Sequence, residues 1–503
     1  CGVVLPGMGE PVMSRLSGLT SWNADWKGVK VLVVGLGVTG FSVADTLWEL
    51  GCEAFVVTSR ASDEHTAILD VIGIDYAIVP DETEMVRLAA EFAPDVIIVS
   101  PGVSPQHPIV SWAATKSIPI WSDIELAWRV RDKVLTSEWI LITGTNGKTT
   151  TTQLTAHVLA TAGFRVAAVG NIGVPVLDAV RDPTGFEFLV VEISSFQLHW
   201  LPTVGEGALR PLVSACLNIA EDHLDWHGSA EAYRAAKGAV YHNTRKSVFY
   251  SRIDPVTEAL VRDANVEEGC EAIGFGLVTP DTGELGTIDG ILVDRAFVPD
   301  RRNNAQELTT VDHLVELGFA TPHMILNILA ASGMALSVGA SAVDVATGLD
   351  SFQLDHHRCE TVTENAGVTW IDDSKATNAH AANASLRAFP SLVWIVGGMF
   401  KGTQIDELVQ AHQSRLRAVI AIGVDRDEPR RAMAAWAPDV PFIEIDADNV
   451  MDAAVSAAAL HASPGDTVLL APAAASMDQF VDYADRGRQF QAAVRTHVGL
   501  TDE

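Results

Sequence analysis

The stretch from Trp139 to Thr150 constrains the fold of this chain more than any other part of it. An apolar segment, Trp139–Thr143, runs directly into Gly144-Thr145-Asn146-Gly147-Lys148-Thr149-Thr150. Glycines let backbone N–H groups turn toward an anion, a lysine can reach the outer phosphates of a nucleotide, and a threonine hydroxyl at a helix N-terminus can bind Mg²⁺. The pattern predicts a strand, a phosphate-binding loop and a helix over about 149–162 that stops at Gly163.

This loop departs from the standard phosphate-loop spacing, which would require a glycine at the position of Ile142. An ordinary glycine-rich turn between a strand and a helix is the structural alternative. The shortened form Gly-Thr-Asn-Gly-Lys-Thr-Thr resembles the loop of the Mur ligase family and of its folylpolyglutamate synthetase relatives. The resemblance implies a protein that uses ATP to join an amino acid to a carboxylate.

Length and composition bound the class of protein. A chain of 503 residues predicts about three domains, and 48% hydrophobic with 19% charged residues is typical of a globular protein. The net charge of −30 argues against nucleic acid as a partner. No apolar run reaches the roughly 18 residues that a membrane span needs, and no leader-like segment opens the chain, so we expect a cytoplasmic protein. The five scattered cysteines favour reduced, structural thiols.

Short apolar runs alternate with helical stretches along the whole chain, which predicts doubly wound α/β domains. We expect a Rossmann-like N-terminal domain over 1–122, whose first 25 or so residues are given no function. A central P-loop-type ATPase domain follows over 123–354, with an inserted hairpin near 273–293. A Rossmann-like C-terminal domain is expected over 355–503. Ligands of such domains bind at the carboxyl ends of the strands.

The N-terminal domain carries a glycine loop after its first predicted strand, Gly35-Leu-Gly-Val-Thr-Gly40. This matches a dinucleotide fingerprint, but a nicotinamide site would also need an acid at the end of the second strand, where Thr58, Ser59 and Arg60 stand. The loop therefore predicts a pyrophosphate binder without a ribose-reading carboxylate. Ser100, at the end of another predicted strand, either permits close approach to a phosphate or belongs to a simple turn.

Three further residues of the central domain are candidates for the metal chemistry of ATP. Glu192 ends the predicted strand Phe188–Glu192, which should lie beside the phosphate-loop strand, where Mg·ATP needs an oxygen ligand. His223 lies in the acidic run 218–225, which is either a ligand cluster or a solvated turn. Lys237 shares a helix face with Tyr233 and, from the residues alone, would be a surface lysine.

The C-terminal domain contains Asp372-Asp373-Ser374-Lys375-Ala376-Thr377-Asn378, an acid, a base and a hydroxyl packed between a strand and a helix. This string resembles the branch of the Mur ligases that adds D-glutamate, whereas the sister branches carry different residues there. The resemblance extends from about Lys27 to the C-terminus. It implies an ATP-dependent amide-forming ligase of peptidoglycan synthesis that passes through an acyl phosphate, with UDP-N-acetylmuramoyl-L-alanine and D-glutamate as substrates. The charge and the lack of a long apolar run predict no nucleic-acid or membrane partner, and the sequence leaves open whether the chain is a monomer.

The resemblance also implies roles for individual residues. The expected catalytic residues are Lys148, Glu192, His223, Lys237 and Arg358. Two Mg²⁺ ions are expected on Thr149, Glu192, His223 and Lys237, the last as a carbamate formed with CO₂. ATP would be held by Gly144, Thr145, Asn146, Gly147, Lys148, Thr149, Thr150, Asn327, Arg358 and Asp373. The UDP substrate would be held by Val38, Thr39, Gly40, Ser59, Arg60, Ser100, Gly170 and Asn171. D-glutamate would be held by Lys375, Thr377, Lys401, Ser476, Met477 and Tyr483.

The chain departs from the usual family pattern at Thr58, Met324, Met399 and Tyr483. Three other functions compete with this expectation. One is a sister Mur ligase or a folylpolyglutamate synthetase-like ligase. Another is a nicotinamide-dependent oxidoreductase that uses the Gly35 loop, although that function leaves the Lys148 loop, Glu192 and Lys237 unexplained. The third is a protein that binds ATP without turning it over.

Overall fold

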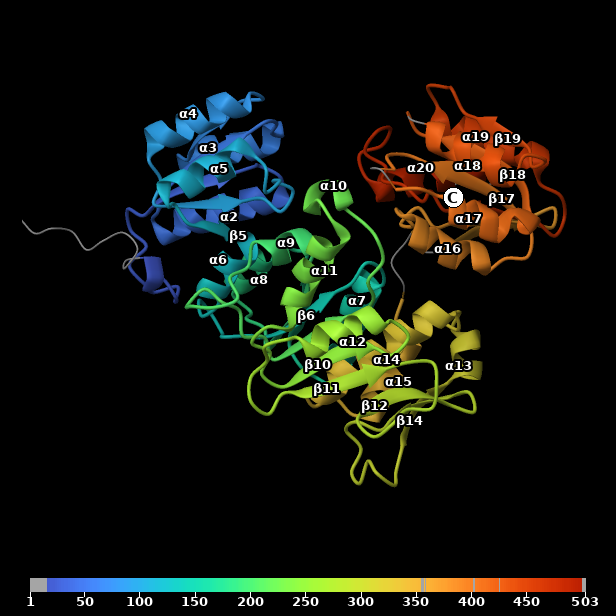
Figure 1. Ribbon diagram of the computed structural model, residues 1–503, viewed down its shortest axis with the longest axis horizontal. Coiled ribbons are helices and arrows are strands. Elements are labelled where there is room, and N and C mark those ends of the chain that lie inside the picture. The colour runs from blue at the N-terminus through green and yellow to red at the C-terminus, as the bar shows by residue number, and fades with distance from the viewer. Residues whose placement is uncertain (1–15, 354–356, 358, 401–402, 425, 500–503) are drawn as a thin grey trace, which may run out of the picture. The chain divides into compact units, whose positions relative to one another are not determined.

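The computed structural model describes residues 16–353, 357, 359–400, 403–424 and 426–499 (Figure 1). The contacts divide the chain into two compact units, Cys1–Ile219 with Glu231–Phe352, and Ala220–Ala230 with Gln353–Glu503. The first unit holds a five-stranded and a nine-stranded sheet, and the second holds a six-stranded sheet. The predicted fold class, three α/β domains each with its own mainly parallel sheet, is confirmed.

The first sheet is wholly parallel, in the order β3-β2-β1-β4-β5. Its strands are β1 (Lys30–Val34), β2 (Glu53–Thr58), β3 (Asp75–Ile78), β4 (Val96–Val99) and β5 (Ile120–Ser122). The helices between them are α2 (Val38–Leu50), α3 (Asp63–Ile72), α4 (Glu82–Phe92) and α5 (Pro108–Lys116). The order reverses at β1, so the loops that follow β1 and β4 open into the crevice where ligands of such sheets bind.

The second sheet follows the order β14-β13-β12-β11-β10-β9-β6-β8-β7. Its strands are β6 (Glu138–Thr143), β7 (Val166–Gly170), β8 (Phe188–Glu192), β9 (Val213–Cys216), β10 (Ser247–Ser251), β11 (Glu271–Phe275), β12 (Glu284–Ile288), β13 (Ile291–Asp294) and β14 (Gln306–Thr310). The predicted hairpin is the antiparallel pair β12 and β13, which β14 extends. Strand β6 lies between β8 and β9, so the loop after β6 lies beside the ends of both neighbours.

The helices of this central region pack around that sheet. They are α6 (Asp123–Arg129), α7 (Lys148–Thr161), α8 (Val176–Arg181), α9 (Ser195–His199), α11 (Ala230–Gly238), η1 (Ala239–Tyr241), α12 (Pro255–Arg262), α13 (Val311–Glu316), α14 (Pro322–Ser337) and α15 (Ala342–Ser351). No helix in the described parts of the chain is both long enough and apolar enough to span a bilayer.

Within the first unit, polar contacts join the region of the five-stranded sheet to that of the nine-stranded sheet. Arg181 Nη1 donates to Asp45 Oδ2 over 2.7 Å, and Ser42 Oγ donates to Asp178 Oδ1 over 2.6 Å. Close to the point where β5 passes into α6, Gln197 Nε2 donates to Asp123 Oδ2 over 3.1 Å. Asp123 is buried, and burial raises the pKa of its carboxyl to about 6.

The second unit contains the sheet β15-β16-β20-β17-β18-β19, in which only β15 is antiparallel. The strands are β15 (Glu360–Asn365), β16 (Val368–Asp372), β17 (Leu392–Gly397), β18 (Leu416–Ile422), β19 (Phe442–Glu444) and β20 (Thr467–Leu470). The helices are α10 (Leu224–His227), α16 (Ala379–Arg387), α17 (Asp406–His412), η2 (Gln413–Arg415), α18 (Asp427–Trp436), α19 (Val450–His461) and α20 (Tyr483–His497).

Each face of this six-stranded sheet has its own apolar cluster. Trp394 and Val396 of β17 belong to one cluster, whereas Val393 and Ile395 belong to the other. Successive side chains of a strand point to opposite faces, so the continuous apolar run of β17 is explained by burial on both sides. The loops that follow β16, β17 and β20 share the carboxyl edge of the sheet.

Candidate active site

The loop between β6 and α7 has the backbone geometry of a phosphate cradle. Gly144 and Gly147 have φ values of +151° and +82°. At Gly147 a Cβ atom would also lie 2.4 Å from Oδ1 of Asn327, so glycine is needed both for the backbone and for the space. Helix α7 begins at Lys148, one residue before the predicted start, and Gly163 follows its end with φ +91°. The predicted strand, loop and helix are present.

Asn218, just after β9, braces this loop. Its backbone carbonyl accepts from the N–H of Thr145 over 2.9 Å, and its side-chain Oδ1 accepts from the N–H of Asn146 over 2.8 Å. Its Nδ2 donates back to the carbonyl of Asn146 over 3.0 Å. Sequence reasoning included Asn218 only as the first residue of the run 218–225, because its contact with the loop depends on the pairing of β9 with β6.

Lys148, Thr149 and Glu192 lie at this loop, as expected. Lys148 Nζ donates to the carbonyls of Gly144 and Thr145 over 2.9 and 2.8 Å. The hydroxyl of Thr149 donates to Glu192 Oε2 over 2.8 Å, and both side chains are buried. A hydroxyl beside a carboxylate is the kind of oxygen donor set that Mg²⁺ prefers. Two of the predicted metal ligands of the first unit, Thr149 and Glu192, are therefore brought together.

The turn after β7 packs against the end of β8. Asn171 donates its backbone N–H to the carbonyl of Glu192 over 2.9 Å and its Nδ2 to Glu192 Oε1 over 3.1 Å. Gly170 has φ +107°, and a Cβ there would lie 2.3 Å from the same carbonyl. Asn171 thus occupies one carboxylate oxygen of Glu192 while Thr149 occupies the other.

Lys237 is buried at 2% exposure, so the surface-lysine interpretation from sequence is wrong. Its Nζ donates to the carbonyl of Gly144 over 2.9 Å and to Thr143 Oγ1 over 3.3 Å. Nζ also lies 5.1 Å from the ring centroid of Tyr233, whose hydroxyl lies 2.9 Å from Thr145 Oγ1. The face predicted for this helix therefore contacts the phosphate loop directly.

The glycine loop of the N-terminal sheet packs against the loop after β4. A Cβ at Gly35 would lie 2.5 Å from Ser100 Oγ, and one at Gly40 would lie 2.1 Å from the carbonyl of Gly35. The hydroxyl of Ser100 is buried and has no hydrogen-bond partner within the described chain. Val38, in the first turn of α2, is 64% exposed. An unpartnered hydroxyl beside a glycine loop is chemically suited to an anionic or sugar oxygen.

The end of β2 gives no support to a nicotinamide site. Thr58 is buried, and its hydroxyl donates to the carbonyl of Arg60 over 2.7 Å. Ser59 and Arg60 follow it at the edge of the crevice, and no acid stands where a ribose would be read.

In the second unit, Lys375 lies in the turn after β16. Its Nζ lies 4.9 Å from the ring centroid of Tyr483, and its backbone N–H donates to the carbonyl of His357 over 3.2 Å. A cavity of about 140 Å³ lies at the same edge, lined by Asp222, His223, Thr377, Asn378, Met399, Phe400, Thr403, Ala473 and Ala475. Ser476 is buried, whereas Met477 is 59% exposed.

Arg486 of α20 ties the loops of this edge together and was missed by sequence reasoning. Its side chain is fully buried and donates to Ser374 twice, from Nε to Oγ over 3.0 Å and from Nη2 to the carbonyl over 2.8 Å. Nη1 donates to the carbonyl of Ala474 over 3.2 Å. Burial lowers the pKa of Arg486 to about 10, so the guanidinium remains charged at neutral pH.

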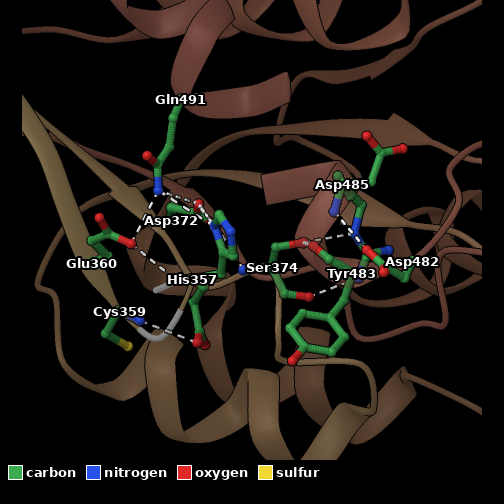
Figure 2. Close-up of polar contacts among 11 residues, drawn as sticks. His357, Cys359, Glu360, Asp372, Ser374, Asp482, Tyr483, Asp485 and Gln491 are labelled. Carbon is green, nitrogen blue, oxygen red and sulfur yellow. Dashed lines mark hydrogen bonds and ion pairs between the residues drawn. The ribbon is translucent and has the colours of Figure 1, made fainter. Parts of the chain in front are cut away.

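A second polar cluster surrounds His357 (Figure 2). Nδ1 of His357 lies 2.6 Å from Oδ2 of Asp372, and this hydrogen bond raises the pKa of His357. Gln491 Nε2 donates to Asp372 Oδ2 over 2.9 Å and to Glu360 Oε2 over 3.0 Å. Although His357, Glu360 and Asp372 could also hold a metal ion by their spacing, each already has a hydrogen-bond partner in this cluster.

The remaining predicted residues are placed as follows. Asn327 is buried beside Gly147. Asp373 accepts the N–H of Cys359 over 3.2 Å and the hydroxyl of Ser385. His223 has φ +53°, its Nε2 lies 3.6 Å from Asp222 Oδ2, and it belongs to the second unit. Arg358 and Lys401 lie outside the described residues.

The described cysteines, Cys52, Cys216, Cys270 and Cys359, form no disulfide, as predicted.

A phosphate loop is contacted by a lysine, a threonine and a carboxylate, and its sheet is one of three α/β sheets in the chain. This combination is that of an ATP-using ligase. The chain belongs to the Mur ligase family, because the MurD-like N-terminal domain matches residues 29–122, the Mur ligase middle domain matches 142–335, and the glutamate ligase domain matches 357–474. Together these matches cover more than half of the chain.

Curated relatives of nearly the same length are UDP-N-acetylmuramoylalanine–D-glutamate ligases. The protein of that name from Leifsonia xyli is 55% identical over 495 residues, covering 96% of each chain. Those from Streptomyces avermitilis and Tropheryma whipplei are 48% and 46% identical, covering 94% and 97% of this chain and 99% of each relative.

Among solved structures, UDP-N-acetylmuramate-alanine ligase from Thermotoga maritima has a TM-score of 0.55 at 18% identity, covering 93% of this chain and 99% of that one. MurF ligase from the same organism, solved in complex with ADP, has a TM-score of 0.51 at 18% identity, covering 96% and 98%. At these identities the likeness is one of fold.

Proposed function

We propose that this chain is an ATP-dependent ligase that joins D-glutamate to UDP-N-acetylmuramoyl-L-alanine in peptidoglycan synthesis. The observation that carries the proposal is the meeting of Lys148, Thr149 and Glu192 at one phosphate loop. It is supported by full-length relatives of that name at up to 55% identity. The presence of Lys148, Glu192, His223 and Lys237 together favours turnover over an ATP-binding protein that has lost it.

The three sheets suggest that each domain binds a different substrate. Residues 1–122 would bind the UDP substrate, residues 123–354 would bind ATP, and residues 355–503 would bind D-glutamate. In the first domain, the unpartnered hydroxyl of Ser100 and the adjacent Gly35 loop are suited to the oxygens of the nucleotide. The residues proposed for this substrate are Val38, Thr39, Gly40, Ser59, Arg60, Ser100, Gly170 and Asn171.

The reaction would proceed in two substitutions. A carboxylate oxygen of the UDP substrate attacks the γ-phosphorus of ATP, the bond to the bridging oxygen breaks, and ADP leaves. The amine of D-glutamate then attacks the carbonyl carbon of the acyl phosphate, inorganic phosphate leaves with the C–O bond electrons, and the nitrogen loses a proton. Lys148 and the N–H groups of the loop would hold the transferring phosphoryl oxygens. Arg358 is proposed as a second cation for them.

The residues at the phosphate loop fit Mg²⁺. Thr149 and Glu192 would hold one ion, because their oxygens already lie 2.8 Å apart and both are hard donors. His223 and a modified Lys237 are proposed for the second. When bound, such ions neutralise charge that builds up on phosphoryl oxygens.

A carbamate on Lys237 would need a neutral amine that attacks CO₂ and loses a proton, which leaves an anionic oxygen ligand on the side chain. Two observations support this proposal. Lys237 is buried, and its Nζ lies at the carbonyl of Gly144, inside the loop that would hold the phosphates. Burial favours the neutral form of an amine, which is the form that reacts.

D-glutamate carries two carboxylates, so its site should be rich in cations and hydroxyls. Lys375, beside Tyr483 and near Thr377, meets this requirement, and Ser476 lies in the loop after β20. Lys401 and Met477 complete the proposed set. We further propose that the protein acts in the cytoplasm, where ATP is supplied, and that it is a monomer.

The test is phosphate release from ATP in the presence of UDP-N-acetylmuramoyl-L-alanine with one amine at a time. We expect release with D-glutamate and none with L-glutamate, L-alanine, meso-diaminopimelate or L-lysine. Release that follows another amine would identify a sister ligase. Absence of release with every amine, despite measurable ATP binding, would favour the binding protein, and tight binding of NADH would favour the oxidoreductase.

A further inference from the structure

The backbone around His357 adopts a conformation that side-chain-bearing residues rarely take. His357 has φ +67° and Cys359 has φ +44°, both in the left-handed region. Such conformations persist only where surrounding contacts fix them, and they concentrate at functional sites. Here the contacts come from strands β15 and β16 and from helix α20.

The fixing contacts are specific. The backbone N–H of His357 donates to Glu360 Oε2 over 2.8 Å, and its ring lies 2.6 Å from Asp372 Oδ2. Gln491, two turns along α20 from Tyr483, donates to both of those carboxylates and lies 3.4 Å from the ring nitrogen (Figure 2). One amide group therefore holds the two acceptors that position His357.

Helix α20 also makes room for the ring. Gly487 lies in the interior of this helix, where alanine would normally be more stable. A Cβ at Gly487 would lie 2.2 Å from Nδ1 of His357. Gly487 thus leaves space for the imidazole of His357, and the amide of Gln491 contacts the same ring.

His357 in turn holds the turn that carries Lys375. The carbonyl of His357 accepts the N–H of Lys375 over 3.2 Å, while the other oxygen of Asp372, Oδ1, accepts the N–H of Ser374 over 2.9 Å. The hydroxyl of Ser374 donates to the carbonyl of Tyr483 over 2.7 Å. Asp372 thus contacts both the imidazole of His357 and the turn that contains Ser374 and Lys375.

We propose that Gln491 and Asp372 are positioning residues for D-glutamate, which act through His357 to hold the Lys375 turn in its binding geometry. This inference rests on the proposed function, because Lys375 is the group that would contact the substrate. Neither Gln491 nor Asp372 needs to touch D-glutamate itself. Their effect is on where the backbone of the turn lies.

The test compares Gln491→Met with Gln489→Met in the full-length protein. Methionine matches glutamine in length but donates no hydrogen bond. Gln489 lies on the same helix, is exposed and donates from Nε2 to Asp485 Oδ2 over 3.2 Å, so its replacement controls for a change of residue type. We expect the KM for D-glutamate to rise about tenfold in Gln491→Met and by less than about twofold in Gln489→Met, as expected for loss of a hydrogen bond to a charged group.

The KM for the UDP substrate should change by less than about twofold in both variants, because the residues proposed for that substrate lie in the first unit, whereas the network lies at one sheet edge of the second unit. A purely structural role would lower the melting temperature and leave the KM for D-glutamate unchanged, which would overturn the proposal. If Gln491→Met fails to fold, Asp372→Asn gives the same comparison, since asparagine keeps an acceptor for Ser374 but not the carboxylate.

A second readout separates this proposal from the proposed function. Amide hydrogen exchange of the peptide 372–378 should be faster in Gln491→Met than in wild type and unchanged in Gln489→Met. This holds whichever amine the enzyme uses. Unchanged exchange would overturn the positioning role, whereas faster exchange in a protein that shows no D-glutamate-dependent phosphate release would leave positioning intact and reject the proposed substrate.

Discussion

The hydroxyl of Thr149 donates to Oε2 of Glu192 over 2.8 Å, which joins the first turn of α7 to the end of β8. The pair exists because β6 and β8 are neighbours in the sheet, although 43 positions separate the two residues. Both side chains are buried, so their oxygens are shielded from bulk water.

From this pair we expect Glu192→Gln to lower kcat by at least about a hundredfold, because an amide keeps the shape but lacks the charge that a divalent cation requires. Steady-state rates measured over a series of Mg²⁺ concentrations check this. Thr149→Ser, which keeps the hydroxyl, is the control and should stay within about fivefold of wild type. An unaltered Mg²⁺ dependence in Glu192→Gln would contradict the assignment.

Gly147→Ala should weaken ATP binding. The new Cβ would lie 2.4 Å from Asn327 Oδ1 at a backbone φ of +82°, so the loop must shift. We expect the Kd for ATP, measured by calorimetry, to rise about tenfold or more, since such strain costs on the order of 1–3 kcal/mol.

The matched control for that variant is Gly163→Ala. Gly163 also has a positive φ, +91°, but a Cβ there meets nothing within 4 Å. This variant should lose stability without losing ATP affinity. Equal loss of affinity in the two variants would show that the effect is global rather than local.

Lys237→Ala should nearly abolish turnover while ATP binding stays measurable. The reason is that Lys237 contacts the carbonyl of Gly144 and, in the proposed mechanism, supplies a carbamate oxygen. Lys246→Ala, at an exposed lysine of the same sheet region, is the control and should retain activity. Incorporation of ¹³C from bicarbonate, followed by NMR, should give a carbamate signal in wild type that is missing in Lys237→Ala. Full activity of Lys237→Ala would reject the carbamate.

Asp123 should make the folded state less stable as pH rises, which is the opposite of the usual effect of a carboxyl group in a folded protein. Burial raises its folded pKa from 3.8 to about 6, so the folded state binds a proton more tightly than the unfolded state does. The contribution of Asp123 to stability is therefore fully present below about pH 4 and is lost as pH rises through about 6. A shift of this size corresponds to at most about 3 kcal/mol.

Asp123→Asn should remove that dependence, because the amide does not ionise and can still accept from Gln197. The measurement is the free energy of unfolding of both proteins from pH 4 to pH 8. Glu125 has its pKa raised to about 7 by burial, but it is present in both proteins, so the difference between them isolates Asp123. A constant difference across that range would refute the assigned direction.

Much of the fold was predictable, because the deciding signals are local. The apolar run before Gly144, the glycine at Gly163 and the βαβ rhythm each follow from neighbouring residues, and each is confirmed. The family resemblance, on the strings around Lys148 and Lys375, is confirmed as well.

What could not be predicted depends on contacts between distant parts of the chain. Lys237 looks like a surface lysine in its own helix and is buried only because that helix packs on the phosphate loop. Asn218 gains its role from the pairing of β6 and β9. Arg486 gains its role because α20 packs on the turn that contains Ser374, which lies more than 100 positions earlier in the chain. A sequence pattern has no access to such pairings.

The separate apolar clusters on the two faces of the six-stranded sheet have a thermodynamic consequence. A unit with its own core on both sides carries its own cooperativity, so heating need not melt it together with the phosphate-loop region. Calorimetry of the intact chain should then show more than one transition. ATP should raise the melting temperature of the transition that belongs to the first unit, which contains the phosphate loop, by more than that of the other transition.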